Sequence, residues 1–163
     1  MNPMTRLLVL AALLLAACAE NADSQAPRTQ DPQLTASSPE LEQRDLPVAQ
    51  EDLHILTRAE ELLSDVSVWN RSDDRECSAD EAMGKRSLFC SLQKACIDVS
   101  GTYDHRRVAL QEVRFAVEDA TRGQDFAHRL MDFNNLPSTQ FADVKEVLRV
   151  AKERVNSRLQ TLE

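Results

Sequence analysis

The segment from Val48 to Leu136 contains no proline, and all three glycines of the chain lie inside it, at Gly84, Gly101 and Gly123. Proline breaks helix interiors, and glycine is favoured just beyond a helix end. The glycines fall where helical patterns stop, and no stretch alternates apolar and polar residues as a half-buried strand does. The sequence therefore predicts an all-α fold, a small single-domain bundle of about five helices over residues 48–163.

Apolar residues recur at helical spacing in five stretches. The first stripe consists of Ile55, Ala59, Leu62, Val66 and Trp69. The second consists of Leu88, Leu92, Ala95, Cys96 and Val99. The third consists of Leu110, Val113, Val117 and Ala120, with Asp104 expected as its N-cap and Tyr103 and Val108 as a hydrophobic staple. A short helix is expected near Asp125 to Phe133, and a long one follows with Phe141, Val144, Leu148, Ala151, Val155 and Leu162. The polar segment from Asn70 to Lys85 is expected to be a loop.

An uninterrupted run of nine apolar residues, Leu7 to Leu15, follows Arg6 and leads into Ala16-Ala17-Cys18. A membrane span needs about 20 apolar residues, so this run has the length of a signal-peptide core. Leu15-Ala16-Ala17-Cys18 resembles a bacterial lipobox. The resemblance implies that residues 1–17 are a signal peptide, that Cys18 carries lipid such as palmitate, and that Ala19 directs the protein to the outer membrane, facing the periplasm.

Residues 18–47 are expected to be the lipidated cysteine followed by a flexible linker. They contain four of the six prolines of the chain, at Pro27, Pro32, Pro39 and Pro47, and no aromatic residue. Such a segment cannot bury enough apolar surface to offset the conformational entropy lost on folding.

The formal net charge of the chain is −8, and loss of Arg6 with the leader makes the remainder more acidic. Nucleic-acid binding depends on basic residues that replace counterions at phosphates, so nucleic acid is not expected as a partner. The expected partners are the membrane, through the lipid on Cys18, and another protein of the cell envelope.

Scattered positions in the helical region also carry a resemblance. They are Trp69, Phe89-Cys90-Ser91-Leu92, Phe133-Asn134-Asn135, and Thr139 ahead of Phe141-Ala142-Asp143-Val144. Over roughly residues 54–155 this pattern resembles a group of small bacterial helical domains of unknown function. The resemblance implies a helical fold and no particular activity.

Three cysteines remain once Cys18 is acylated, which in an oxidising compartment suggests one disulfide and one free thiol. Cys90 and Cys96 lie on one predicted helix and are separated by a rise of about 9 Å. Bridged Cα atoms lie within about 7 Å, so Cys77 must be one partner. Cys96 falls inside the apolar arc of its helix, whereas Cys90 lies on the far face. The expected bridge is therefore Cys77–Cys90, with Cys96 as a buried thiol.

Two polar groups are candidates for a binding site. If Asp104 caps a helix, then His105, Arg106 and Arg107 fill its first turn, where the dipole disfavours cations and an anion could bind. The alternative is that an acidic residue of a neighbouring helix neutralises this turn. His128 and Asp132, four residues apart, could hold a metal ion with His105, but such a pair is more often a solvated surface pair. Trp69 and Asn134 could border the same cleft. No metal, cofactor or catalytic residue is assigned from these patterns.

These observations together favour a lipid-anchored helical binding or structural module of the cell envelope. One alternative is a small envelope enzyme or anion-binding domain that uses His105, Arg107, His128 and Asp132. A second alternative is an inhibitor or immunity-type lipoprotein whose acidic surface meets a basic partner such as a toxin or a lysozyme.

Overall fold

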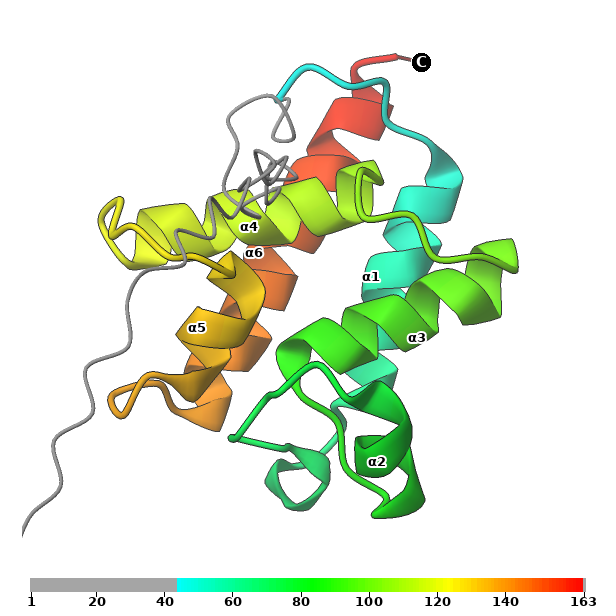
Figure 1. Cartoon of the computed structure of the whole chain (residues 1–163). Helices are drawn as coiled ribbons and strands as arrows, with labels where there is room; N and C mark the ends of the chain where they lie inside the picture. The colour runs from blue at the N-terminus through cyan, green and yellow to red at the C-terminus, as the bar shows by residue number, and fades with distance from the viewer. Residues whose placement is uncertain (1–43, 163) are drawn as a thin grey trace, which may run out of the picture. The chain divides into compact units, whose positions relative to one another are not determined.

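The structure is a computed structural model that describes residues 44–162. The predicted leader and residues 18–43 of the predicted linker lie outside the described residues. Within the described part the fold is all-α, as predicted, and contains no named strand (Figure 1). Its elements are α1 (Gln50–Leu62), a short 3₁₀ helix η2 (Val66–Val68), α2 (Cys77–Ala82), α3 (Leu88–Ser100), α4 (Val108–Ala120), α5 (Arg129–Asn135) and α6 (Phe141–Gln160).

The core is formed where α1 packs against α3 and α6, and where α4 packs against α6 (Figure 1). Each of these helices contributes leucine, isoleucine or valine side chains with no exposed surface, including Ile55, Leu56, Leu92, Leu110, Val113, Leu148 and Val155. Burial of one such side chain stabilises the fold by about 1.5–3 kcal/mol, before the loss of chain entropy is considered. The stripes predicted for α3, α4 and α6 supply this core except at two ends: Ala120 is exposed, and Leu162, which lies beyond the end of α6, is 71 % exposed.

The first predicted stripe is too long, because α1 ends at Leu62. Asp65 directly afterwards accepts a hydrogen bond from the Ser67 amide at 2.8 Å and begins η2. Such a local side-chain bond competes with helix continuation. Val66 is consequently 58 % exposed, while Trp69 is buried on an extended segment that pairs with Arg86.

The segment predicted as a loop, Asn70 to Lys85, contains a further helix. Helix α2 has six residues, from Cys77 to Ala82, and a short segment joins it to α3. The sequence of α2 has no apolar stripe, so periodicity gives no signal for it. An isolated helix of this length is unstable in water, and its attachment to α3 through the disulfide holds it in place.

The prediction that Asp104 caps the third helix is wrong, because α4 begins at Val108 with Arg107 as its N-cap. Asp104 instead closes a turn by accepting a hydrogen bond from the Arg106 amide at 2.9 Å. The cap for α4 comes from α1, where the buried Asp52 accepts from the Ala109 amide at 3.2 Å. The other carboxylate oxygen of Asp52 accepts from the Ala49 amide at 2.9 Å, so one side chain serves two helix N-termini.

The last residues of the predicted linker lie on the helical domain. Arg44 pairs with Glu118 of α4 at 2.8 Å, and its guanidinium carbon lies 4.0 Å from the centroid of the Phe115 ring. Arg158 of α6 donates to the carbonyl of Leu46. Residues of the predicted linker within 44–47 therefore contact α4 and α6.

Candidate functional site

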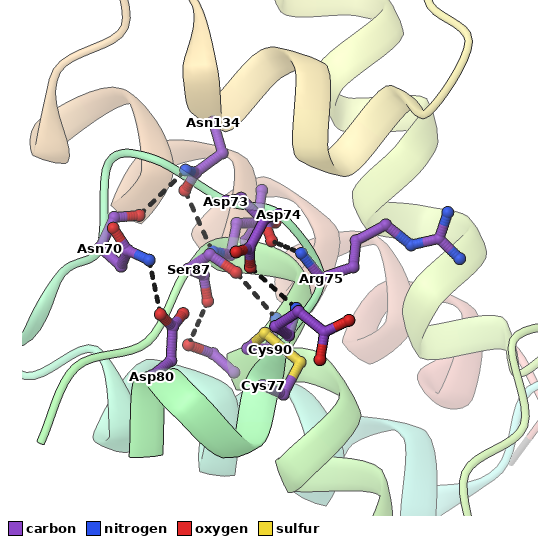
Figure 2. Close-up of a disulfide and its surroundings, with 12 residues drawn as sticks. Asn70, Asp73, Asp74, Arg75, Cys77, Asp80, Ser87, Cys90 and Asn134 are labelled. Carbon is purple, nitrogen blue, oxygen red and sulfur yellow. Dashed lines mark hydrogen bonds between the residues drawn. A yellow bond between two sulfur atoms is a disulfide. The ribbon is translucent and has the colours of Figure 1, made fainter. Parts of the chain in front are cut away.

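The Cys77–Cys90 disulfide joins the start of α2 to the first turn of α3, and its Cα atoms are 5.2 Å apart (Figure 2). This is the pair expected from the helical angles of the sequence. Cys96 is a free, fully buried cysteine. Burial raises the pKa of its thiol to about 11, so Cys96 is a protonated core residue at neutral pH.

Asn134 of α5 links the segment before α2 to the helices. Its Oδ1 accepts from the indole nitrogen of Trp69 at 2.8 Å and from the amide of Leu88 at 3.1 Å. Its Nδ2 donates to the carbonyl of Asn70 at 3.0 Å (Figure 2). The same nitrogen donates to Oδ1 of Asn135 at 3.1 Å. The full hydrogen-bonding capacity of this buried amide is used, so its role in the fold is to hold other residues in position.

The loop from Asn70 to Glu76 is fixed by further polar contacts. Asn135 and Asp73 exchange two hydrogen bonds, with the Asp73 amide donating at 2.7 Å and the Asp73 carbonyl accepting at 2.8 Å. Asn70 donates to the buried carboxylate of Asp80 at 2.6 Å. These contacts and the disulfide fasten both ends of the loop to the bundle.

Arg75 lies in this loop in the left-handed backbone region, with φ of 69°. Its amide donates to the carboxylate of the buried Asp73 at 2.8 Å, and this turn holds the strained conformation in place. A non-glycine residue held in this region costs of order 1 kcal/mol, and such residues are concentrated at functional sites. Figure 2 shows the Arg75 side chain extended away from the disulfide.

The Arg75 side chain lines an open groove of about 490 Å³ between the loop before α2 and the loop that joins α3 to α4. We call this feature the groove. Its lining consists of Asp74, Arg75, Glu76, Phe89, Gln93, Tyr103 and His105. Phe89 and Tyr103 meet edge to face with ring centroids 6.1 Å apart, and the Arg75 guanidinium carbon lies 5.5 Å from the Phe89 centroid.

Several polar groups of the groove form no side-chain hydrogen bond within residues 44–162. They are the carboxylate of Glu76, the amide of Gln93, the hydroxyl of Tyr103 and the imidazole of His105. Tyr103 is half-buried, and this burial raises the pKa of its hydroxyl. It therefore stays a neutral donor and acceptor at physiological pH. The groove thus offers donors and acceptors that the described domain itself does not use.

The predicted site residues do not form one cluster. His105 lines the groove, and the ring of His128 lies within 3.4 Å of an Arg75 guanidinium nitrogen. Arg107, however, pairs with Glu51 of α1 at 2.7 Å, which is the neutralising arrangement considered as the alternative to an anion site. Arg106 is exposed beside Asp104, and Asn134 is buried in the network around Trp69.

The expected pairing of His128 with Asp132 on one helix face is replaced by a cap. His128 precedes the first residue of α5, and its amide donates to the Asp132 carboxylate at 2.7 Å. In the part of the chain that the structure describes, no group of three histidine, cysteine or acidic residues is arranged to hold a metal ion. The described helices also include none that is long and apolar enough to cross a membrane.

Sequence reasoning did not identify Arg75, Phe89 and Gln93 as neighbours in one groove. Phe89 and Gln93 are four residues apart and share a face of α3, which the sequence could have indicated. Arg75 could not be placed, because its position depends on a loop fastened by residues of α5 about sixty positions later.

A comparison with known protein families identifies the family of this domain. The model of the family of unknown function DUF6197 matches residues 47–154, more than half of the chain, and the match includes every residue of the groove. The chain belongs to the DUF6197 family. No curated protein and no solved structure is matched by the chain. The DUF6197 assignment agrees with the expected resemblance to small helical domains of unknown function, and it carries no activity with it.

Proposed function

We propose that this DUF6197 protein is a lipoprotein of the bacterial cell envelope. In this proposal Cys18 carries the lipid, residues 1–17 are the cleaved leader, and the helical domain is a binding module. The observation that carries the proposal is the Cys77–Cys90 disulfide. Disulfides persist in oxidising compartments and are rare in the cytosol of mesophilic bacteria. The bridge therefore agrees with the location in the cell envelope that Leu15-Ala16-Ala17-Cys18 predicts.

The groove is the surface through which the module would bind. It lies beside the disulfide, contains the strained Arg75, and carries four side chains whose polar groups the domain leaves without partners. A binding surface needs such groups held in place before the ligand arrives, because fewer side chains then lose freedom on binding. The contacts of Asn134, Asn135 and Asp73 provide that fixed position.

The two alternatives receive less support. Within residues 44–162 no hydrogen bond joins a histidine ring to a serine, threonine or cysteine side chain, so no nucleophile–base pair favours an envelope enzyme. An inhibitor of a basic partner is supported by the net charge of −8 alone. Charge of this kind affects the rate and selectivity of association without identifying a partner.

The anchor is tested by growing cells that express the full chain with radiolabelled palmitate. We expect label on the wild type and on Cys96→Ser, and none on Cys18→Ser. Both variants remove one sulfur atom, and immunoblots of the same samples give the amount of each protein, so the comparison separates lipidation at Cys18 from a general loss of protein. Fractionation should place the labelled protein in the outer membrane. Equal labelling of Cys18→Ser and the wild type would overturn the proposal.

A further inference from the structure

We propose that the groove binds an uncharged saccharide. This inference rests on the proposed binding role of the groove and adds the chemical class of its ligand. It depends on the charges and aromatic rings of the residues that line the groove.

The charged residues of the groove alternate in sign along the chain. Asp74 and Glu76 flank Arg75 directly, and His105 lines the groove from the loop before α4. An anionic ligand at Arg75 would lie beside two carboxylates, and a cationic ligand at those carboxylates would lie beside the guanidinium. Because the lining of the groove carries both signs of charge, a charged ligand would meet groups of like charge as well as groups of opposite charge. The groove therefore favours a ligand without net charge.

The same residues offer many hydrogen bonds in a small space. The guanidinium of Arg75, the amide of Gln93 and the carboxylate of Glu76 are planar groups that can each form two parallel hydrogen bonds. Neighbouring hydroxyl groups of a sugar ring are both donors and acceptors and match such paired groups. A ligand lacking hydroxyl groups would leave these side chains without partners when it displaced water, which carries a penalty.

The aromatic pair supplies the remaining part of a sugar site. Phe89 and Tyr103 are each half-buried and packed edge to face, so their rings are held in fixed orientations; the Arg75 guanidinium lies over Phe89, and part of each aromatic side chain stays exposed. The aliphatic C–H face of a pyranose can pack on such a ring, while its hydroxyl edge reaches the polar groups. The groove thus combines a small apolar surface with more polar groups than most small-molecule sites contain, as a ligand rich in hydroxyl groups requires.

The test uses isotope-labelled full-length protein in dodecylphosphocholine micelles, because detergents with sugar headgroups would compete. Chitotriose and maltotriose are added as uncharged trisaccharides, and amide chemical shifts are followed. We expect saturable shifts at Arg75, Phe89, Gln93 and Tyr103 with at least one of the two sugars. Triglycine, a zwitterion, and inorganic phosphate should leave these resonances in place.

Two variants locate the binding. Gln93→Ala and Tyr103→Phe each remove one polar group that has no partner in the described domain, so the fold should persist. Each should raise the dissociation constant about fivefold, the effect of one neutral hydrogen bond. Gln124→Ala removes an exposed amide outside the groove and should leave it unchanged.

Unchanged sugar affinity in both groove variants would overturn the proposal, and so would an absence of sugar-induced shifts. Saturable shifts with triglycine in place of the sugars would show a peptide site instead. None of these results depends on lipid at Cys18, so they are distinguishable from a failure of the palmitate experiment.

Discussion

The indole nitrogen of Trp69 donates a hydrogen bond to Oδ1 of Asn134 at 2.8 Å, although the two residues are 65 positions apart in the chain. Both residues are buried, with Trp69 9 % exposed and Asn134 fully covered. The same oxygen accepts from the Leu88 amide at the start of α3. One asparagine therefore joins the segment after α1, the first turn of α3, and α5.

Asn134→Ala should destabilise the domain strongly. The substitution leaves the Trp69 indole and the Leu88 amide buried without an acceptor, so we expect a loss of about 3 kcal/mol in the free energy of unfolding. Urea unfolding followed by the fluorescence of Trp69, the single tryptophan of the chain, measures this loss. Asn156→Ala, at an exposed position of α6, should change stability by no more than about 0.5 kcal/mol. Equal effects of the two substitutions would contradict the central role of Asn134.

Reduction of the Cys77–Cys90 bridge should loosen the loop before α3 while leaving the bundle folded. The cysteines are 13 positions apart, and closure of a loop of this size contributes about 3 kcal/mol on the chain-entropy model. Hydrogen exchange of the Cys77→Ser/Cys90→Ser protein should accelerate at the amides of α2 and the preceding loop, with α4 and α6 still protected.

Peptide mapping under non-reducing conditions checks the pairing itself. It should give a crosslinked Cys77–Cys90 peptide, with Cys96 alkylated only after unfolding because this thiol is buried. A Cys77–Cys96 peptide, or three thiols that react freely in the folded protein, would rule out the described arrangement of α3.

Asp73 should make the stability of the domain depend on pH. Burial raises the pKa of this carboxyl in the folded state, with a hydrogen bond from the Arg75 amide acting in the opposite direction. Because the folded-state pKa exceeds the unfolded value of about 4, protonated Asp73 favours folding. This contribution is fully present below the unfolded pKa and is lost as the pH rises through the folded-state pKa.

Asp73→Asn removes that titration. As the pH rises from 4 to 7, the free energy of unfolding of the variant should increase relative to that of the wild type. Urea unfolding at several pH values measures this difference. Asp125→Asn, which changes an exposed carboxylate, serves as the control and should follow the wild-type curve. A difference between Asp73→Asn and the wild type that stays constant with pH would show that Asp73 does not titrate in this range.

Asp52→Ala should destabilise two helices at once, because Asp52 accepts from the Ala49 amide of α1 and the Ala109 amide of α4. The loss of a helix cap costs about 1 kcal/mol, so the expected total is about 2 kcal/mol. Glu51→Ala breaks only the pair with the partly exposed Arg107 and should cost less than about 1 kcal/mol. Thermal unfolding by circular dichroism compares the two, and a larger effect of Glu51→Ala would contradict the described caps.

Arg107→Ala provides a related measurement with inorganic phosphate. Since Glu51 neutralises Arg107 and the N-cap of α4 has an internal carboxylate, calorimetry should detect no phosphate binding at this turn in the wild type. Phosphate binding to the wild type that is lost in Arg107→Ala would instead support the anion site that the sequence suggested at this turn.

The sequence by itself determined the parts of the fold that depend on local periodicity. The apolar stripes of α3, α4 and α6 identified the helices and the faces that pack in the core, because a side-chain pattern of 3.6 residues is a property of neighbouring positions. The angular positions of Cys90 and Cys96 on α3 likewise indicated which cysteine faces Cys77, since both lie on one regular helix.

Only the tertiary structure decided where the helices begin and how the groove is assembled. Asp52 caps α4 from α1, so the local signal at Asp104 pointed to the wrong first residue. The α2 helix has no apolar stripe and depends on the disulfide and on the hydrogen bond from Asn70 to Asp80. Arg75 and Tyr103 line one groove because Asn134 and Asn135 hold the loop before α2. Contacts between residues this distant follow from packing, and no periodicity in the chain encodes them.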